Sequence, residues 1–209
     1  MSGAQIEAKS LVLIDRQRPA GLFDDAQWQI VRRMIQACGD FAITWDVCFS
    51  ADAVAAGLKV LRAGCPIFVD SNMIKAGISL ERLRAVCPAY EQRRIICHVA
   101  DADVAAEARR HSLPRAIFAV RKAKFFLGGS VAAFGNSPTA LMELNRMIIE
   151  DGIKPALVIA MPVGFIHVEE SKEELFALDV PYIGLRGNRG GSPLAVSVIH
   201  ALAGLIEVT

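Results

Sequence analysis

Two helix starts in the second half of the chain combine the residue types that bind anions. The stretches GNSPTALMEL and GGSPLAVSVI place Ser137 and Ser192 where a side chain can cap a helix, each followed by a proline in the first turn. Gly135 lies two residues before Ser137, and Gly190 and Gly191 come directly before Ser192, so a ligand can approach the backbone closely at both starts. The N–H groups and positive dipole of such an end suit a carboxylate or a phosphate, and Arg186 and Arg189 can add forked hydrogen bonds. Each start can also be no more than a well-capped helix.

The elements that must position these residues alternate between strands and helices. Short runs of Ile, Val and Phe, typical of a sheet buried on both faces, predict strands at 66–70, 94–99, 130–135, 156–161 and 181–185. Amphipathic patterns predict helices at 25–37, 51–63, 80–86, 102–111, 115–126, 138–150, 169–178 and 193–205, and N-cap positions are expected at Asp24, Ser50 and Ser79. We therefore expect one α/β domain over residues 1–209, with an open, mainly parallel sheet of about five strands and helices on both faces.

The carboxyl edge of this sheet is the expected binding edge, because open parallel sheets bind ligands at the ends of their strands. The segments that follow the predicted strands are 70–73, 98–101, 135–139, 162–165 and 186–192. Asp70 and Asn72 can bind an amide or acid group there, or only shape a turn. The candidate binding residues in these loops are Asp70, Asn72, Asn136, Ser137, Thr139, Gly164, Arg186, Gly190, Gly191 and Ser192.

Composition excludes several classes of protein. With 23 basic and 22 acidic residues the net charge is +1, which gives no general reason to bind nucleic acid. No apolar run is long enough to span a membrane, and the start of the chain lacks the order of a signal peptide. The five cysteines form no C-x-x-C pair, so we expect no zinc site and a location in the reducing cytoplasm. The glycine-rich loop before Ser192 fits neither a P-loop nor a dinucleotide fingerprint, and the 53% hydrophobic content favours a buried sheet, an oligomer interface, or both.

The same loops resemble a known family. FGNSPTAL (134–141), PALVIAMPVGFIHVEESKEEL (155–175) and RGNRGGSPLAVSVIHAL (186–202) resemble the signature blocks of precorrin-8X methylmutase, the precorrin isomerase of cobalamin biosynthesis. Further similar stretches are 6–14, 49–78 and 113–121. The resemblance implies a homodimeric α/β enzyme, with its site near the subunit interface, that moves a methyl group from carbon 11 to carbon 12 of precorrin-8 or cobalt-precorrin-8. It implies no metal or organic cofactor. It also implies that Ser10 and Arg115 contact the substrate, whose rim carries acetate and propionate groups.

One position departs from the family pattern. The stretch RRMIQACGD has Gln36 where the resemblance implies a histidine, the acid that protonates the macrocycle. A glutamine amide donates a hydrogen bond but does not titrate near neutral pH. Three interpretations stay open: Gln36 binds the ring and solvent supplies the proton, His167 is a substitute acid, or the chain binds a corrinoid without isomerising it. His167 can also be a surface histidine beside Glu169 and Glu170. Without the resemblance, the two S-P helix starts would also suit an enzyme that binds a phosphosugar or another acid.

Overall fold

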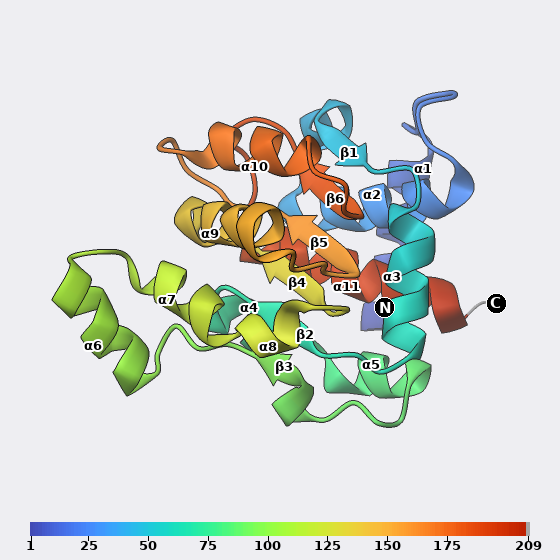
Figure 1. The fold of residues 1–209 in the computed structure, drawn as a ribbon. Helices are drawn as coiled ribbons and strands as arrows, with labels where there is room; N and C mark the ends of the chain where they lie inside the picture. The colour runs from blue at the N-terminus through green and yellow to red at the C-terminus, as the bar shows by residue number, and fades with distance from the viewer. Residues whose placement is uncertain (208–209) are drawn as a thin grey trace.

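Six strands form a single sheet in the computed structural model, which describes residues 1–207 (Figure 1). The strands are β1 (Val47–Phe49), β2 (Ile67–Val69), β3 (Ile95–Ile96), β4 (Val131–Phe134), β5 (Leu157–Ala160) and β6 (Tyr182–Leu185), in the spatial order β1-β6-β5-β4-β2-β3. Strands β2 to β6 pair in parallel, as the sequence predicts. Residues 208–209 of the expected domain lie outside the described part of the chain.

The sheet has one strand more than the sequence indicates. Strand β1 pairs antiparallel with β6, and the register sets Val47 opposite Leu185 and Phe49 opposite Ile183. Its three residues, Val47 to Phe49, lie at the edge of the sheet, and an apolar run of this length is too short to be recognised as a strand in the sequence. The predicted fold class is confirmed, with this edge strand added.

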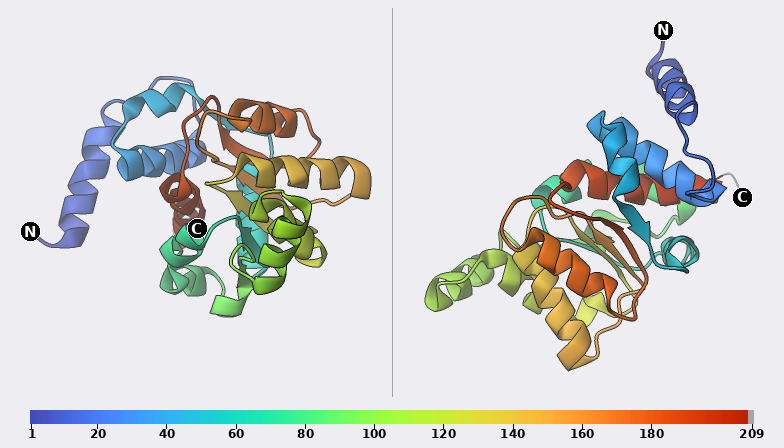
Figure 2. Two further views of the ribbon diagram at one scale, coloured as in Figure 1. Left: turned by 90° about the vertical axis from the view of Figure 1, so that its left-hand side faces the viewer. Right: turned by 90° about the horizontal axis from the view of Figure 1, so that it is seen from above.

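The helices cover both faces of the sheet. They are α1 (Gly3–Asp15), α2 (Asp25–Cys38), α3 (Ala53–Arg62), α4 (Asn72–Gly77), α5 (Leu80–Val86), α6 (Ala102–His111), α7 (Arg115–Lys122), α8 (Lys124–Leu127), α9 (Pro138–Asp151), α10 (Val168–Phe176) and α11 (Ser192–Glu207). Figure 2 shows α2 and α11 on one side of the sheet and α9 and α10 on the other. Alternation along β4 explains both layers, because Val131 and Ala133 belong to the core under α2 and α11, whereas Ala132 and Phe134 belong to the core under α9.

Several helix boundaries follow local chemistry that the sequence reveals, and others do not. Asp24 and Gln27 form a capping box at α2, and Ser79 caps α5. Ser50 was expected to cap a helix; instead its side chain accepts the Tyr182 N–H at 3.0 Å and joins the end of β1 to β6. Helices α1 and α4 and the short 3-10 turns η1 (Phe41–Trp45) and η2 (Gln92–Arg94) were not expected, and the helix predicted at 115–126 divides into α7 and α8 at Ala123.

Helix α1 projects from the body of the molecule (Figure 2). Its contacts to α2 include an ion pair between Glu7 and Arg33 and a hydrogen bond from Trp28 Nε1 to Asp15 at 2.7 Å. Ile6, Val12 and Leu13 on α1 are at least half exposed. None of the helices within residues 1–207 is both long and apolar enough to cross a lipid bilayer.

Candidate functional site

Asp70 joins two of the predicted binding loops. It follows β2, is 2% exposed, and its carboxylate accepts the backbone N–H groups of Gly135, Asn136 and Ser137 at 3.1, 2.9 and 2.7 Å. Burial raises the pKa of the Asp70 carboxyl, and the three N–H donors oppose this rise. An internal carboxylate therefore organises the start of α9 and uses N–H groups that a ligand could otherwise have bound.

The glycines before α11 allow other segments of the same protein to approach the loop backbone closely. A side chain at Gly190 would overlap the backbone carbonyl of Met161, and the Gly191 N–H donates to that same carbonyl at 2.7 Å. Gly135 lies against the start of α11, where an added Cβ would be 2.8 Å from Ser192 Cα. The Ser71 and Ser192 hydroxyls lie 3.1 Å apart. The loops after β2, β4, β5 and β6 thus form one connected edge.

Lys172 fixes the loop between β6 and α11 through hydrogen bonds to the loop backbone. Its ammonium is buried and donates to the carbonyls of Gly187 and Arg189, both at 2.8 Å, and burial lowers its pKa to about 8. In the sequence Glu169 precedes Lys172 by three residues, so the spacing alone indicates no more than a pair on the surface of a helix. A lysine on the buried face of a helix that precedes a glycine-rich loop was the available signal for this role.

The loop after α2 belongs to the same edge. Arg189 forms ion pairs with Asp40 at 2.7 Å and Asp46 at 2.5 Å, and Asp40 also accepts the Ala42 N–H. The forked contact expected of Arg189 is therefore made to carboxylates of this chain. Arg186 is largely exposed and lies 3.8 Å from a Glu173 oxygen. The corner that follows Gln36 ends a helix and also joins the carboxyl edge of the sheet.

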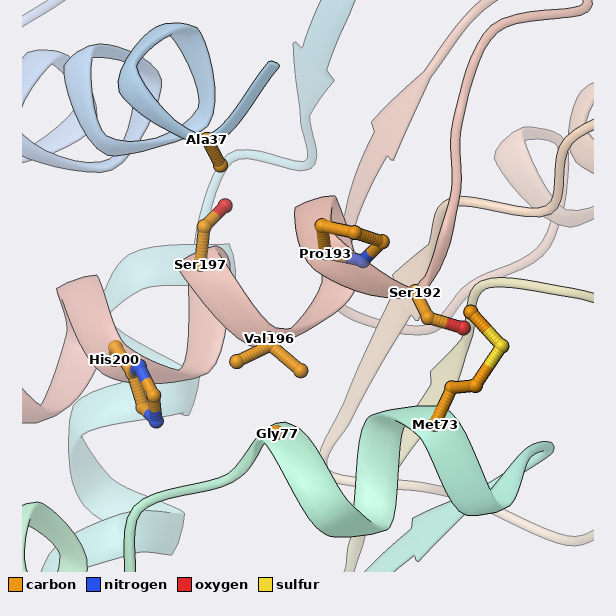
Figure 3. A pocket seen from close by; sticks show the side chains of 8 residues that line it. All are labelled: Ala37, Met73, Gly77, Ser192, Pro193, Val196, Ser197 and His200. Carbon is orange, nitrogen blue, oxygen red and sulfur yellow. The ribbon is translucent and has the colours of Figure 1, made fainter.

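A hollow of about 380 Å³ opens at the start of α11 (Figure 3). Its lining comes from three helices: Ala37 of α2, Met73 and Gly77 of α4, and Ser192, Pro193, Val196, Ser197 and His200 of α11. Most of this lining is apolar, and Ser192 is the predicted binding residue that it contains. An apolar ring edge fits such a wall better than a free phosphate does.

A second hollow of about 520 Å³ brings Ser10 and Gln36 together between α1 and α2. Ser10 donates its hydroxyl to the Ile6 carbonyl at 3.0 Å, and Arg33 donates to Gln36 Oε1 at 3.3 Å. The amide nitrogen of Gln36 makes no hydrogen bond within residues 1–207. Since Ala37 lines the first hollow and Gln36 the second, the last turn of α2 separates the two.

Other candidate residues lie apart from these hollows. Arg115 is exposed at the first residue of α7, and His167 is exposed in the left-handed conformation, φ 60°, before α10, without a side-chain bond to the helix. Asn72 is exposed at the first residue of α4, and Asn136 is exposed in the loop between β4 and α9. Two further candidates contact other parts of the same edge. Thr139, in the first turn of α9, has its Oγ1 3.0 Å from Ser137 Oγ, and the N–H of Gly164, at φ 141°, donates to the Asn188 carbonyl at 3.2 Å. The described residues contain no group of three or more His, Cys, Asp or Glu side chains that could hold a metal ion.

His200 lies in the wall of the first hollow, although no motif in the sequence indicates a role for it. Its Nε2 accepts the Ser79 N–H at 2.9 Å. Burial lowers the pKa of His200 to about 4, and the positive charges of Arg82 and Arg33 add to this effect.

Replacing His200 by glutamine, which can still accept the Ser79 N–H, is expected to flatten the pH dependence of stability. The folded protein keeps this imidazole neutral down to about pH 4, whereas in the unfolded chain it takes up a proton near 6.5. The unfolded state binds more protons between these values, so stability falls as pH decreases through this window. Urea unfolding at about pH 7 and about pH 4.5 measures this change. Between the two, the free energy of unfolding of the parent should fall by roughly 1–2 kcal/mol, because solvent screens part of the charge on the imidazole, and that of the variant should fall by less. Equal losses in both proteins would contradict this assignment.

The fold and this edge define a doubly wound α/β protein whose binding loops meet at the carboxyl ends of parallel strands. Residues 5–205 match the precorrin-8X methylmutase family. The chain is 39% identical to the cobalt-precorrin-8 methylmutase of Leptospira interrogans, over 96% of this chain and 92% of that protein. It is 40% identical to the precorrin-8X methylmutase of Pseudomonas aeruginosa, over 88% and 86%.

A solved structure agrees with the sequence relatives. The crystal structure of a precorrin-8X methylmutase from Thermus thermophilus superposes with a TM-score of 0.89 at 40% identity, and the match covers 99% of this chain and 97% of that one. The chain belongs to the precorrin-8X methylmutase family, which confirms the resemblance predicted from its motifs.

Proposed function

We propose that the protein is an isomerase of cobalamin biosynthesis that moves a methyl group from carbon 11 to carbon 12 of precorrin-8 or cobalt-precorrin-8. The observation that carries the proposal is the family match over residues 5–205. The bond from the methyl group to carbon 11 breaks and the bond to carbon 12 forms within one molecule, so no atom is gained or lost. Relatives named for either substrate leave both forms of the ring as candidates, and any cobalt is part of the substrate.

The chain's own residues then bind and orient the macrocycle. The apolar hollow at the start of α11 accepts an edge of the ring, and Ser10 and Gln36 offer hydrogen bonds from the neighbouring hollow. Gln36 can stabilise added charge on the ring through its amide, but it cannot give up a proton. We propose that solvent supplies the proton in this chain. Asp70 and Lys172 act indirectly, because they fix the loops rather than touch the ring.

We further propose that the enzyme is a homodimer with the site near the subunit interface. Phe165 and Ile166, on the loop after β5, are 88% and 73% exposed, and α1 presents further apolar side chains. Exposed apolar residues in this number favour a partner surface. Sedimentation equilibrium measures the oligomeric state directly, and a monomer at micromolar concentration would refute the proposed homodimer. The five cysteines are unpaired within residues 1–207, in keeping with the reducing cytoplasm in which we place the reaction.

The decisive experiment supplies purified protein with precorrin-8 and, separately, with cobalt-precorrin-8. We expect conversion to the methyl-shifted product, followed by the change in visible absorbance of the ring and confirmed by the unchanged mass of the product. A protein that binds the ring but leaves the methyl group on carbon 11 would instead be a corrinoid-binding relative without isomerase activity.

A further inference from the structure

A strongly basic hollow lies along α11, next to the one in Figure 3. It encloses about 620 Å³ between α2, α5 and α11, and its lining residues are Asp25, Ala26, Gln29, Arg32, Arg33, Arg82, His200, Ala201, Gly204 and Leu205. His200 lines both hollows, so the two adjoin on the surface of α11. Eight residues of helix, about 12 Å, separate Ser192 from His200.

The guanidinium groups of this hollow have more donors than the protein uses. Arg82 forms no ion pair or hydrogen bond through its side chain within residues 1–207. Arg32 pairs with Asp15 at 2.9 Å, but its Nε is buried and has no partner. A buried donor without an acceptor is costly, and an anion in the hollow would satisfy it.

The acids near the hollow do not cancel its charge. Asp25 is the acidic residue of the lining, and it already pairs with Arg18 at 2.8 Å. Glu7 of α1 reaches over α2 to form an ion pair with Arg33. Glu7 also lies close enough to Arg82 for that positive charge to help lower the pKa of Glu7, but Arg82 forms no ion pair within residues 1–207, so Arg32, Arg33 and Arg82 share two carboxylates. The neutral state of His200 fits this environment, because a second cation there would be repelled.

We propose that this hollow is an anion-binding subsite in which Arg82, together with Arg32, binds a carboxylate side chain of the substrate. The proposal rests on the proposed function for the identity of the ligand. A macrocycle with acid groups around its rim can place its apolar edge against Met73 and Val196 and an acid arm beside Arg82. Arginine suits this role, because its planar fork matches the two oxygens of a carboxylate. Free inorganic phosphate has the same recognition chemistry and is therefore part of the test.

The test compares Arg82→Gln and Arg82→Lys with a matched control, Arg93→Gln, which removes an exposed arginine that pairs with Glu91. A contact to a remote acid arm stabilises the bound substrate and the transition state alike. Arg82→Gln should therefore raise KM about tenfold with kcat unchanged, lysine should recover part of the loss, and the control should behave as the parent. A structural role for Arg82 would instead lower the unfolding midpoint, which urea unfolding measures.

Equilibrium binding separates this inference from the proposed function. Calorimetry with propane-1,2,3-tricarboxylate and with inorganic phosphate needs no turnover, so it applies even if the protein does not isomerise its ring. We expect the tricarboxylate to bind the parent and to lose about tenfold in affinity with Arg82→Gln but not with Arg93→Gln. Equal affinities in parent and Arg82→Gln, together with an unchanged KM, would overturn the proposal. Binding of phosphate alone through Arg82 would overturn its assignment to a substrate carboxylate.

Discussion

Replacing Gln36 by histidine should raise the rate of methyl migration by roughly 10²–10⁴-fold, the usual contribution of a general acid. The glutamine lies at the position where the family resemblance implies a histidine, and it lines the hollow that also contains Ser10. An imidazole there can deliver a proton to the ring, whereas the amide can only donate a hydrogen bond. Arg33, which donates to Gln36 Oε1, would favour the neutral imidazole. The variant's kcat should therefore fall as pH rises through a value at or below about 6.5.

Gln17→His is the matched control for this experiment. Gln17 lines the same hollow, so the control adds an imidazole to the same space but at another position. Single-turnover rates for the two variants and the parent, measured across pH, distinguish a general effect of basicity from an acid at position 36. A Gln36→His rate equal to that of the parent, with ring binding intact, would show that solvent or another group remains the proton donor. His167→Ala then separates these two donors, because only a catalytic His167 would make that variant inactive.

Most of the fold that could be predicted from the sequence was indicated by short-range patterns. Apolar runs located the five parallel strands, and short-range capping chemistry located the starts of α2, α5 and α9. Strand β1 was not predicted, because its extended conformation depends on pairing with β6, which lies far along the chain. Helix α4 was not predicted, because its six residues are too few to show a periodic pattern.

The interior of the site depended on contacts between distant segments. Sequence reasoning placed Asp70 and Ser137 at one edge of the sheet, but it could not show that the Asp70 carboxylate accepts N–H groups 65 to 67 residues further along the chain. The glycines before α11 were expected to admit a ligand, yet the backbone of the β5 loop occupies the space beside Gly190. Spacing in a sequence indicates that close approach is required, and only the fold shows which segment approaches.

The clustering of Arg82 with Arg32 could not be predicted from the sequence either. These residues come from α5 and α2, which face each other only because both pack on α11. Each arginine in isolation looks like an ordinary residue of a solvated helix face. The unpaired guanidinium becomes informative once its neighbours are known.

Loss of the Asp70 carboxylate should be the most damaging change at the edge of the sheet. In Asp70→Ala three N–H groups in the buried loop before α9 lose their acceptor, and we expect the free energy of unfolding to fall by at least about 3 kcal/mol. Asp70→Asn keeps the volume, but its NH₂ group would face N–H donors, so it should recover only part of the loss. For a domain of this size, about 3 kcal/mol lowers Tm by roughly 6–12 °C.

Hydrogen exchange distinguishes this local role from a general weakening of the core. In the Asp70→Asn protein, protection at the amides of Gly135, Asn136 and Ser137 should be lost first, while amides in β5 remain protected as long as the protein is folded. The matched control is Asp103→Asn, which removes a surface carboxylate paired with Lys122 and should leave both Tm and exchange nearly unchanged. Because the same carboxylate sets the geometry next to Ser192, turnover should fall together with protection at Ser137. Protection that is unchanged in Asp70→Asn would mean that the strand and helix hold the loop without the carboxylate.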